Sequence, residues 1–181
     1  MKKYIVLGVI VCIVIIGALA WGGIFSKSAK DGIVSGADPA NTTYLIEGEE
    51  VTLVGGVSEV AVADSSSTVR TVIFDQPVIG DLDNDGDKDM ALVLQRQTGG
   101  SGLFYYLVAA LQNPDTTAQG TNALFIGDRI APQGMSIQFG TITFNYADRK
   151  PDEPMSAQPS VGVSLYAKVE RGVLIKSEGQ K

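Results

Sequence analysis

Beyond residue 42, apolar residues occur in short runs that are separated by glycine, proline and acidic residues. Runs of this length, rich in valine, isoleucine, threonine and aromatic residues, are typical of β-strands. No segment shows a long amphipathic helical pattern with capping residues at its ends. We therefore predict a mainly β domain built on antiparallel sheets, with an α+β fold as the alternative. We expect the strands at 43–46, 51–54, 57–63, 69–74, 90–97, 104–112, 123–126, 137–139, 142–146, 161–169 and 173–176.

One run differs from the others because it is apolar at successive positions. Residues 104–111 read Phe-Tyr-Tyr-Leu-Val-Ala-Ala-Leu. They lack the alternation of apolar and polar residues that is typical of a strand with one solvent-exposed face. A strand of this kind is buried on both faces and lies in the middle of a sheet. By contrast, the charged segment 47–50 and the segment 170–172 separate pairs of short runs, which predicts two hairpins.

The N-terminus is unlike the rest of the chain. Lys2 and Lys3 precede an uncharged, mostly apolar run of 22 residues, Tyr4 to Phe25, which as a helix would span about 33 Å and cross the hydrocarbon core of a bilayer. The basic end stays in the cytoplasm, so the remaining chain is expected outside. We thus expect a single-pass transmembrane anchor at 1–25 in a bacterial cytoplasmic membrane, with the domain periplasmic or at the cell surface. The alternative is a signal peptide cleaved after Ala20, which would secrete the domain.

The segment 26–41 contains serine, lysine, glycine, aspartate and proline and has no apolar period, so we expect a flexible linker. Short helical turns are expected within 31–42 or within the polar connection 113–122. The domain then extends over 42–181. Its acidity argues against nucleic acid as a partner: the net charge is −6, and without Lys2 and Lys3 it is −8. The chain has no histidine, and its single cysteine, Cys12, lies in the apolar run. A histidine-based triad and a disulfide within the domain are therefore excluded.

The most specific chemistry lies in the segment 81–89, which reads Asp-Leu-Asp-Asn-Asp-Gly-Asp-Lys-Asp. Five carboxylates this close repel one another unless a cation lies among them. Hard oxygen ligands without nitrogen or sulfur favour Ca²⁺, with Mg²⁺ as the second choice. Gly86 permits the positive φ that folds such a loop around an ion. The predicted metal ligands are Asp81, Asp83, Asp85, Asp89 and, through its backbone carbonyl, Asp87.

The twelfth position of this loop is Leu92, where an EF-hand needs a bidentate carboxylate. The loop is therefore expected on a β-scaffold. The run from Gly80 to Leu92 resembles the calcium loop of FG-GAP and VCBS-type repeats, which read G-D-x-(D/N)-x-D-G-x-x-D before an apolar strand. The resemblance implies the same ligand set. Those proteins carry several repeats in a propeller, whereas this chain carries one loop. Segments such as 99–102, 127–132 and 145–149 resemble an uncharacterised family of small bacterial proteins with an N-terminal anchor, which implies no activity.

These observations predict a non-enzymatic, calcium-stabilised module outside the cytoplasm, tethered by its N-terminal helix, that binds an envelope protein, a peptide or a cell-wall glycan. No catalytic residue is predicted. One alternative is a secreted hydrolase that uses paired carboxylates, Asp128 and Asp148, each of which follows an apolar run. The other is a structural component of an envelope assembly.

Overall fold

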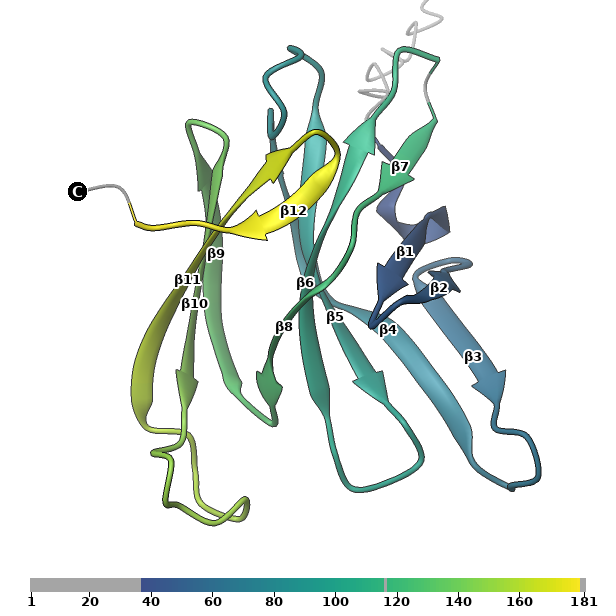
Figure 1. Ribbon diagram of the computed structural model, residues 1–181, viewed down its shortest axis with the longest axis vertical. Coiled ribbons are helices and arrows are strands. Elements are labelled where there is room, and N and C mark those ends of the chain that lie inside the picture. Colours follow the sequence, from purple (N-terminus) through teal and green to yellow (C-terminus); the bar gives the residue numbers. More distant parts are fainter. Residues whose placement is uncertain (1–36, 116, 180–181) are drawn as a thin grey trace, which may run out of the picture. The chain divides into compact units, whose positions relative to one another are not determined.

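A computed structural model describes residues 37–115 and 117–179, which form a β-rich fold (Figure 1). Among these residues the only helix is a single 3-10 turn, η1 (Pro39–Asn41). The strands are β1 (Thr43–Ile46), β2 (Glu49–Thr52), β3 (Val57–Ala61), β4 (Thr68–Gly80), β5 (Asp89–Gln97), β6 (Phe104–Gln112), β7 (Ala118–Gly120), β8 (Leu124–Asp128), β9 (Ala131–Gln138), β10 (Thr141–Asp148), β11 (Val161–Glu170) and β12 (Val173–Lys176).

The strands form three antiparallel sheets, which confirms the predicted mainly β class. The largest sheet has six strands in the order β3-β4-β5-β6-β7, and β8 pairs with β6 along the same edge as β7. The second sheet has the order β12-β11-β10-β9, and β1 pairs with β2 in a small third sheet. Figure 1 shows the four-stranded sheet on one side of β5 and β6 and the β1–β2 hairpin on the other.

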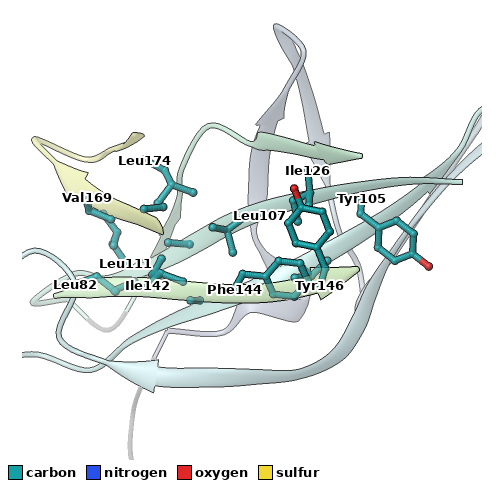
Figure 2. Close-up of a cluster of buried hydrophobic side chains, with 14 of the residues drawn as sticks. Leu82, Tyr105, Leu107, Leu111, Ile126, Ile142, Phe144, Tyr146, Val169 and Leu174 are labelled. Carbon is teal, nitrogen blue, oxygen red and sulfur yellow. The ribbon is translucent and has the colours of Figure 1, made fainter. Parts of the chain in front are cut away.

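The main hydrophobic core lies between the two larger sheets (Figure 2). Alternate residues of β5 and β6, including Val93 and Leu107, meet inward side chains of β10, β11 and β12, including Ile142, Ala167 and Leu174. Alternation with period two is what places these residues on one face. This packing makes a sandwich of the two sheets.

A second core covers the opposite face of β5 and β6. Leu92, Leu94 and Val108 pack there against Tyr44 and Ile46 of the β1–β2 hairpin. The run 104–112 is therefore buried on both faces and central in its sheet, as its sequence predicts. Because a fully buried aliphatic side chain contributes about 1.5–3 kcal/mol, both faces of this strand pair stabilise the fold.

Several strand boundaries differ from the predicted ones for local reasons. Strand β2 begins at Glu49, because the turn before it contains only Glu47 and Gly48, with φ of 54° and 88°. Two residues with positive φ form the tight hairpin turn that matches strand twist. Strand β9 begins at Ala131 rather than at residue 137. Its first half contains Pro132 and Gly134, which are uncommon inside strands, and among the described residues it pairs along one edge only, with β10.

The last five residues of the expected linker belong to the fold. Ala37 and Pro39 are buried, and the Tyr44 hydroxyl donates to the Pro39 carbonyl at 3.0 Å. Of the two places expected for a helical turn, 31–42 contains η1, which Asp38 caps by accepting from the Ala40 N–H. The described residues of 113–122 form no helix and include β7 instead. The predicted anchor at 1–25 and the linker up to residue 36 lie outside the described residues. Within the described part, no helix has the length and apolar character needed to cross a membrane.

The two cores generate a prediction about stability. Leu107→Ala and Leu92→Ala, one in each core and both fully buried, should each lower the free energy of unfolding by about 2–5 kcal/mol, because each leaves a cavity. Val173→Ala, at a half-exposed position, is the control and should change it by less than about 0.5 kcal/mol. Urea unfolding followed by circular dichroism measures all three. A negligible loss for Leu92→Ala would show that the β1–β2 hairpin is not packed as described.

Candidate metal site

The acidic segment 81–89 connects β4 to β5 at the end of the sandwich where β9 turns into β10. Gly80 precedes it, and a Cβ there would stand 2.7 Å from Ile137 Cγ2 of β9, so only glycine allows this approach. On the other side, a Cβ at Gly140 would lie 3.6 Å from the Leu82 carbonyl. The β9–β10 turn thus lies against the acidic segment, and both large sheets support it.

Two buried side chains hold the segment in place. Leu82 enters the main core at the end where Leu111, Ile142 and Val169 lie (Figure 2). Asp89 is fully buried, with 0% of its surface exposed. One of its carboxylate oxygens accepts from the Leu82 N–H at 2.8 Å, and the other accepts from the Gln112 N–H at 2.9 Å. The carboxylate therefore ties the acidic segment to the end of β6.

The remaining aspartates fold the segment into a series of tight turns. The Asn84 N–H donates to Asp81 at 2.8 Å, the Asp85 N–H to Asp83 at 3.2 Å, and the Asp87 N–H to Asp85 at 2.8 Å. Asn84 and Gly86 adopt positive φ of 64° and 92°. Gly86 has the conformation that the sequence predicts for it, and the segment curls so that its carboxylates converge.

Carboxylate oxygens of Asp81, Asp83 and Asp89 lie within 4.8 Å of one another. Oxygens bound to one Ca²⁺ at 2.3–2.6 Å are at most about 5 Å apart, so the three carboxylates can share one ion. Each Asp89 oxygen accepts one N–H bond and retains a lone pair for a metal. Leu92 is buried in the second core, so the twelfth position offers no ligand, as expected for a loop that is not an EF-hand.

The electrostatics of the cluster also favour a cation. Desolvation raises the pKa of Asp89 above its ordinary value of 3.8; the N–H bonds from Gln112 and Leu82 oppose this shift, and the charges on Asp83 and Asp85 add to it. Partial desolvation likewise raises the pKa of Asp83, with further contributions from Asp85 and Asp81 and an opposing N–H bond from Asp85. A bound cation would relieve the part of these shifts that comes from the neighbouring negative charges.

Asp85 and Asp87, the other two predicted ligands, are placed differently. The Asp85 charge acts on both Asp83 and Asp89, so Asp85 belongs to the cluster electrostatically, although its carboxylate is outside the converging group of three. Asp87 is exposed, and its N–H is bound to Asp85. A ligand role for Asp85 and for the Asp87 carbonyl stays a prediction.

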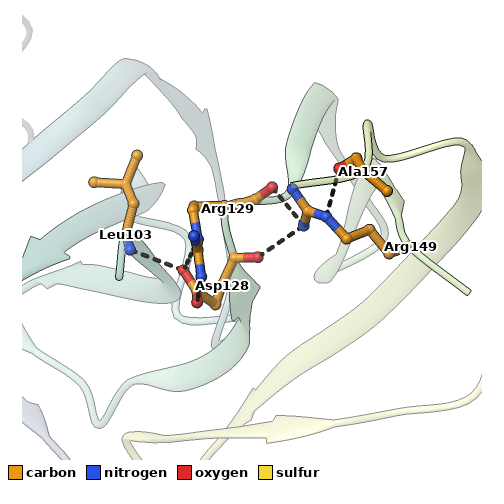
Figure 3. Close-up of polar contacts among 5 residues, drawn as sticks. All are labelled: Leu103, Asp128, Arg129, Arg149 and Ala157. Atoms are coloured by element: carbon orange, nitrogen blue, oxygen red, sulfur yellow. Dashed lines mark hydrogen bonds and ion pairs between the residues drawn. The ribbon is translucent and has the colours of Figure 1, made fainter. Parts of the chain in front are cut away.

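The carboxylates of the hydrolase alternative lie on one surface, around a depression of about 390 Å³ that Asp128, Asp148 and Arg149 border. Figure 3 shows what holds Asp128: Arg129 donates to it at 2.8 and 3.1 Å, and the Leu103 N–H donates at 2.8 Å. These bonds, that of Arg129 above all, lower the pKa of Asp128. A glycosidase acid needs a raised pKa, so this arrangement disfavours Asp128 in that role.

Arg149 holds the surrounding segments together. Its guanidinium donates to the Ala157 carbonyl at 2.6 Å and to the Arg129 carbonyl at 3.0 Å (Figure 3). It thereby fastens the connection between β10 and β11 to the turn between β8 and β9. This accounts for Arg149 as a structural residue.

Sequence reasoning missed a second group of charges at the far end of β5. Arg96 is 7% exposed and follows Leu92 and Leu94 on the face covered by the β1–β2 hairpin. Close by, the Tyr106 hydroxyl donates to Glu47 at 2.9 Å, and burial raises the pKa of Tyr106 to about 12, so the hydroxyl remains a donor at neutral pH. The signal was present in the alternation, because residue 96 shares the face of residues 92 and 94.

The fold and the site together define a class: an antiparallel β-sandwich that carries an acidic loop with three converging carboxylates between neighbouring strands. No family model matches the chain, and the comparisons with curated proteins and with solved structures gave no match. The likeness of the segment 80–92 to FG-GAP-type loops therefore depends on its own residues.

The hydrogen bonds predict that Asp89 and Asp83 differ in the absence of metal. In EDTA, Asp89→Asn should cost about 2–3 kcal/mol of unfolding free energy, because the amide NH₂ would face a buried N–H donor. Asp83→Asn should cost less than about 0.5 kcal/mol, because it removes an exposed charge from a repulsive cluster. Urea unfolding measures both. Equal costs for the two variants would contradict the structural role of Asp89.

The lowered pKa of Asp128 predicts a pH dependence. A carboxylate whose pKa is lowered on folding stabilises the fold at pH values above its ordinary 3.8, and this contribution is lost as the pH falls through the lowered value. Asp128→Asn should therefore cost about 1 kcal/mol at pH 7 and progressively less below pH 4. Urea unfolding from pH 7 to pH 3 tests this, with exposed Asp152→Asn as control. A cost independent of pH would contradict it.

Proposed function

We propose that the acidic segment 81–89 binds one Ca²⁺ ion and that the ion stabilises a non-enzymatic binding module. The observation that carries this proposal is the convergence of the Asp81, Asp83 and Asp89 carboxylates within 4.8 Å around a backbone turn. All three ligands are hard oxygens, and the domain sequence contains no histidine or cysteine. Asp85 and the Asp87 carbonyl are the residues proposed to complete the coordination.

The role proposed for the ion is structural. It would supply positive charge that cancels the repulsion among the carboxylates. Asp89 already binds the N–H groups of Leu82 and Gln112, so a ligand bond at Asp89 would transmit the effect of the ion to β5 and β6. Asp81 and Asp83, bound to the same ion, would hold the outer turn of the segment close to the buried Asp89 carboxylate. The ends of three strands would thereby be held in one arrangement.

We further propose that the domain acts outside the cytoplasm. The support is the sequence at 1–25, an apolar run behind two lysines that suits a single-pass anchor in a bacterial cytoplasmic membrane. The proposed partners are an envelope protein, a peptide or a cell-wall glycan. A binding role suits the described surface better than hydrolysis does, because Asp128 is held ionised by Arg129.

Calcium should raise the stability of the purified full chain. At Ca²⁺ 100-fold above the dissociation constant, the free energy of unfolding should rise by about 2.7 kcal/mol, which corresponds to roughly 5–10 °C in Tm. Asp83→Asn is the matched variant: it should fold in EDTA and lose most of the calcium shift. Circular dichroism melts in EDTA, Ca²⁺ and Mg²⁺ measure this. A Tm that is the same in EDTA and in excess Ca²⁺ would end the calcium proposal.

A further inference from the structure

Strands β2 and β3 enclose a groove. They leave the Gly55–Gly56 turn as a hairpin, joined by two hydrogen bonds between Val54 and Val57 at 2.9 and 3.3 Å. Beyond this bridge they separate: β2 pairs with β1, and β3 pairs with β4. Among the described residues, neither strand has a second pairing partner along the edge that faces the other. The space between them is about 620 Å³.

The wall and the floor of this groove have different characters. The wall is the free edge of β2, Glu49–Thr52. The floor is the outer face of the large sheet and consists of small and β-branched side chains with one cation at its end: Ser58, Val60, Val69, Thr71 and Arg96. Val60 is 60% exposed on this floor, whereas Thr71 is buried. The residues of this wall and this floor define the β2–β3 groove. The groove thus combines a strand edge that has no pairing partner among the described residues with an apolar surface.

Arg96 is the feature that indicates a ligand. Its side chain is 9% exposed, and its Nη2 donates to Glu49 Oε2 at 2.8 Å. Its Nε and Nη1 are also buried, and neither has an acceptor among the described residues. A buried donor on a charged group that lacks an acceptor is costly. The Glu49 side chain is 70% exposed, so its carboxylate can move aside or share Arg96 with an entering group.

We propose that the β2–β3 groove binds a short extended peptide with basic and β-branched residues, which adds to the free edge of β2 as a third strand while its carbonyl groups accept from Arg96. Strand addition satisfies the backbone groups of an open edge and places alternate side chains on the floor. Four paired residues would extend over about 14 Å, the length of β2. This inference names the surface and ligand class of the binding role proposed above and depends on that role.

The charges select the kind of peptide. Glu49 and Glu50 both line the groove, and among the described residues that line it Arg96 is the only one with a cationic side chain. The chain as a whole carries −6. Basic side chains would therefore pair with the glutamates along the wall, whereas an acidic peptide would be repelled there. The Arg96 donors are left for neutral backbone carbonyls, which introduce no further charge.

The test is direct binding of a synthetic probe to the purified full chain. The probe is a fluorescently labelled, C-amidated hexapeptide of sequence Lys-Val-Lys-Val-Lys-Val, followed by fluorescence anisotropy at low salt. Three matched peptides serve as controls: the glutamate analogue, a scrambled-order peptide, and a version with alternate backbone nitrogens methylated. The lysine probe should bind at least about tenfold more tightly than the glutamate and methylated peptides.

Two variants locate the site. Arg96→Met keeps the apolar stem and removes the donors, and Val60→Arg places a cation on the exposed floor without changing the core; each should weaken binding about tenfold or more. Arg70→Met, which removes another paired arginine on the opposite face of β4, should leave binding within about twofold. If Arg96→Met fails to fold, Val60→Arg decides alone.

Each outcome has a defined meaning. The inference is overturned if the lysine probe does not bind, if the glutamate or methylated peptide binds equally well, or if both groove variants bind like the wild type. A different result would be that the wild-type chain self-associates, that Val60→Arg abolishes this self-association, and that the probe does not bind. This result would assign the edge of β2 to a second copy of the chain and would also overturn the inference. Each titration is run in EDTA and in Ca²⁺, which separates this inference from the calcium proposal. Peptide binding together with a Tm that Ca²⁺ leaves unchanged would contradict only the proposed metal site.

Discussion

Strand β5 is buried on both faces, and each of its ends carries a charge that has been removed from water. Asp89 begins the strand and is fully buried, and Arg96 stands one residue before its end with 7% of its surface exposed. A desolvated charge needs partners, and the two ends obtain them in different ways. Asp89 binds two backbone N–H groups from separate segments. Arg96 has one glutamate and two donors without an acceptor in the described structure.

These two solutions explain where the molecule can interact. At the Asp89 end, the backbone is already organised, and the exposed aspartates add negative charge beside the buried one. An added cation would stabilise this arrangement, and the backbone would not have to rearrange to bind it. At the Arg96 end, the β1–β2 hairpin covers the hydrophobic face only in part, and β2 and β3 diverge beyond the Val54–Val57 bridge. The sandwich thus places a candidate ion site and a candidate peptide groove at opposite ends of one strand.

Much of the fold and of the acidic turn could be predicted from local sequence patterns. The two-sided burial of 104–112 follows from an apolar run without alternation, and the acidic turn follows from the spacing of Asp81, Gly86 and Asp89. Features that depend on tertiary contacts could not be predicted. Strand β9 begins at Ala131 despite Pro132 and Gly134, because pairing with β10 overrides weak local propensity. Residues 37–41 have a linker composition, yet Ala37 and Pro39 are buried by the hairpin that follows them. The Arg96 donors that lack an acceptor within the described structure can be recognised only from its tertiary neighbours.

The buried Asp89 carboxylate joins the acidic segment to β6, and we propose that a calcium ion tightens this connection. Amide hydrogen exchange at Leu82 and Gln112, whose N–H groups both donate to Asp89, measures it most directly. We expect both amides to be protected in EDTA, and their exchange to slow by a further tenfold or about 1.4 kcal/mol when Ca²⁺ is added. Fast exchange of both amides in EDTA, with rates that Ca²⁺ leaves unchanged, would contradict the account.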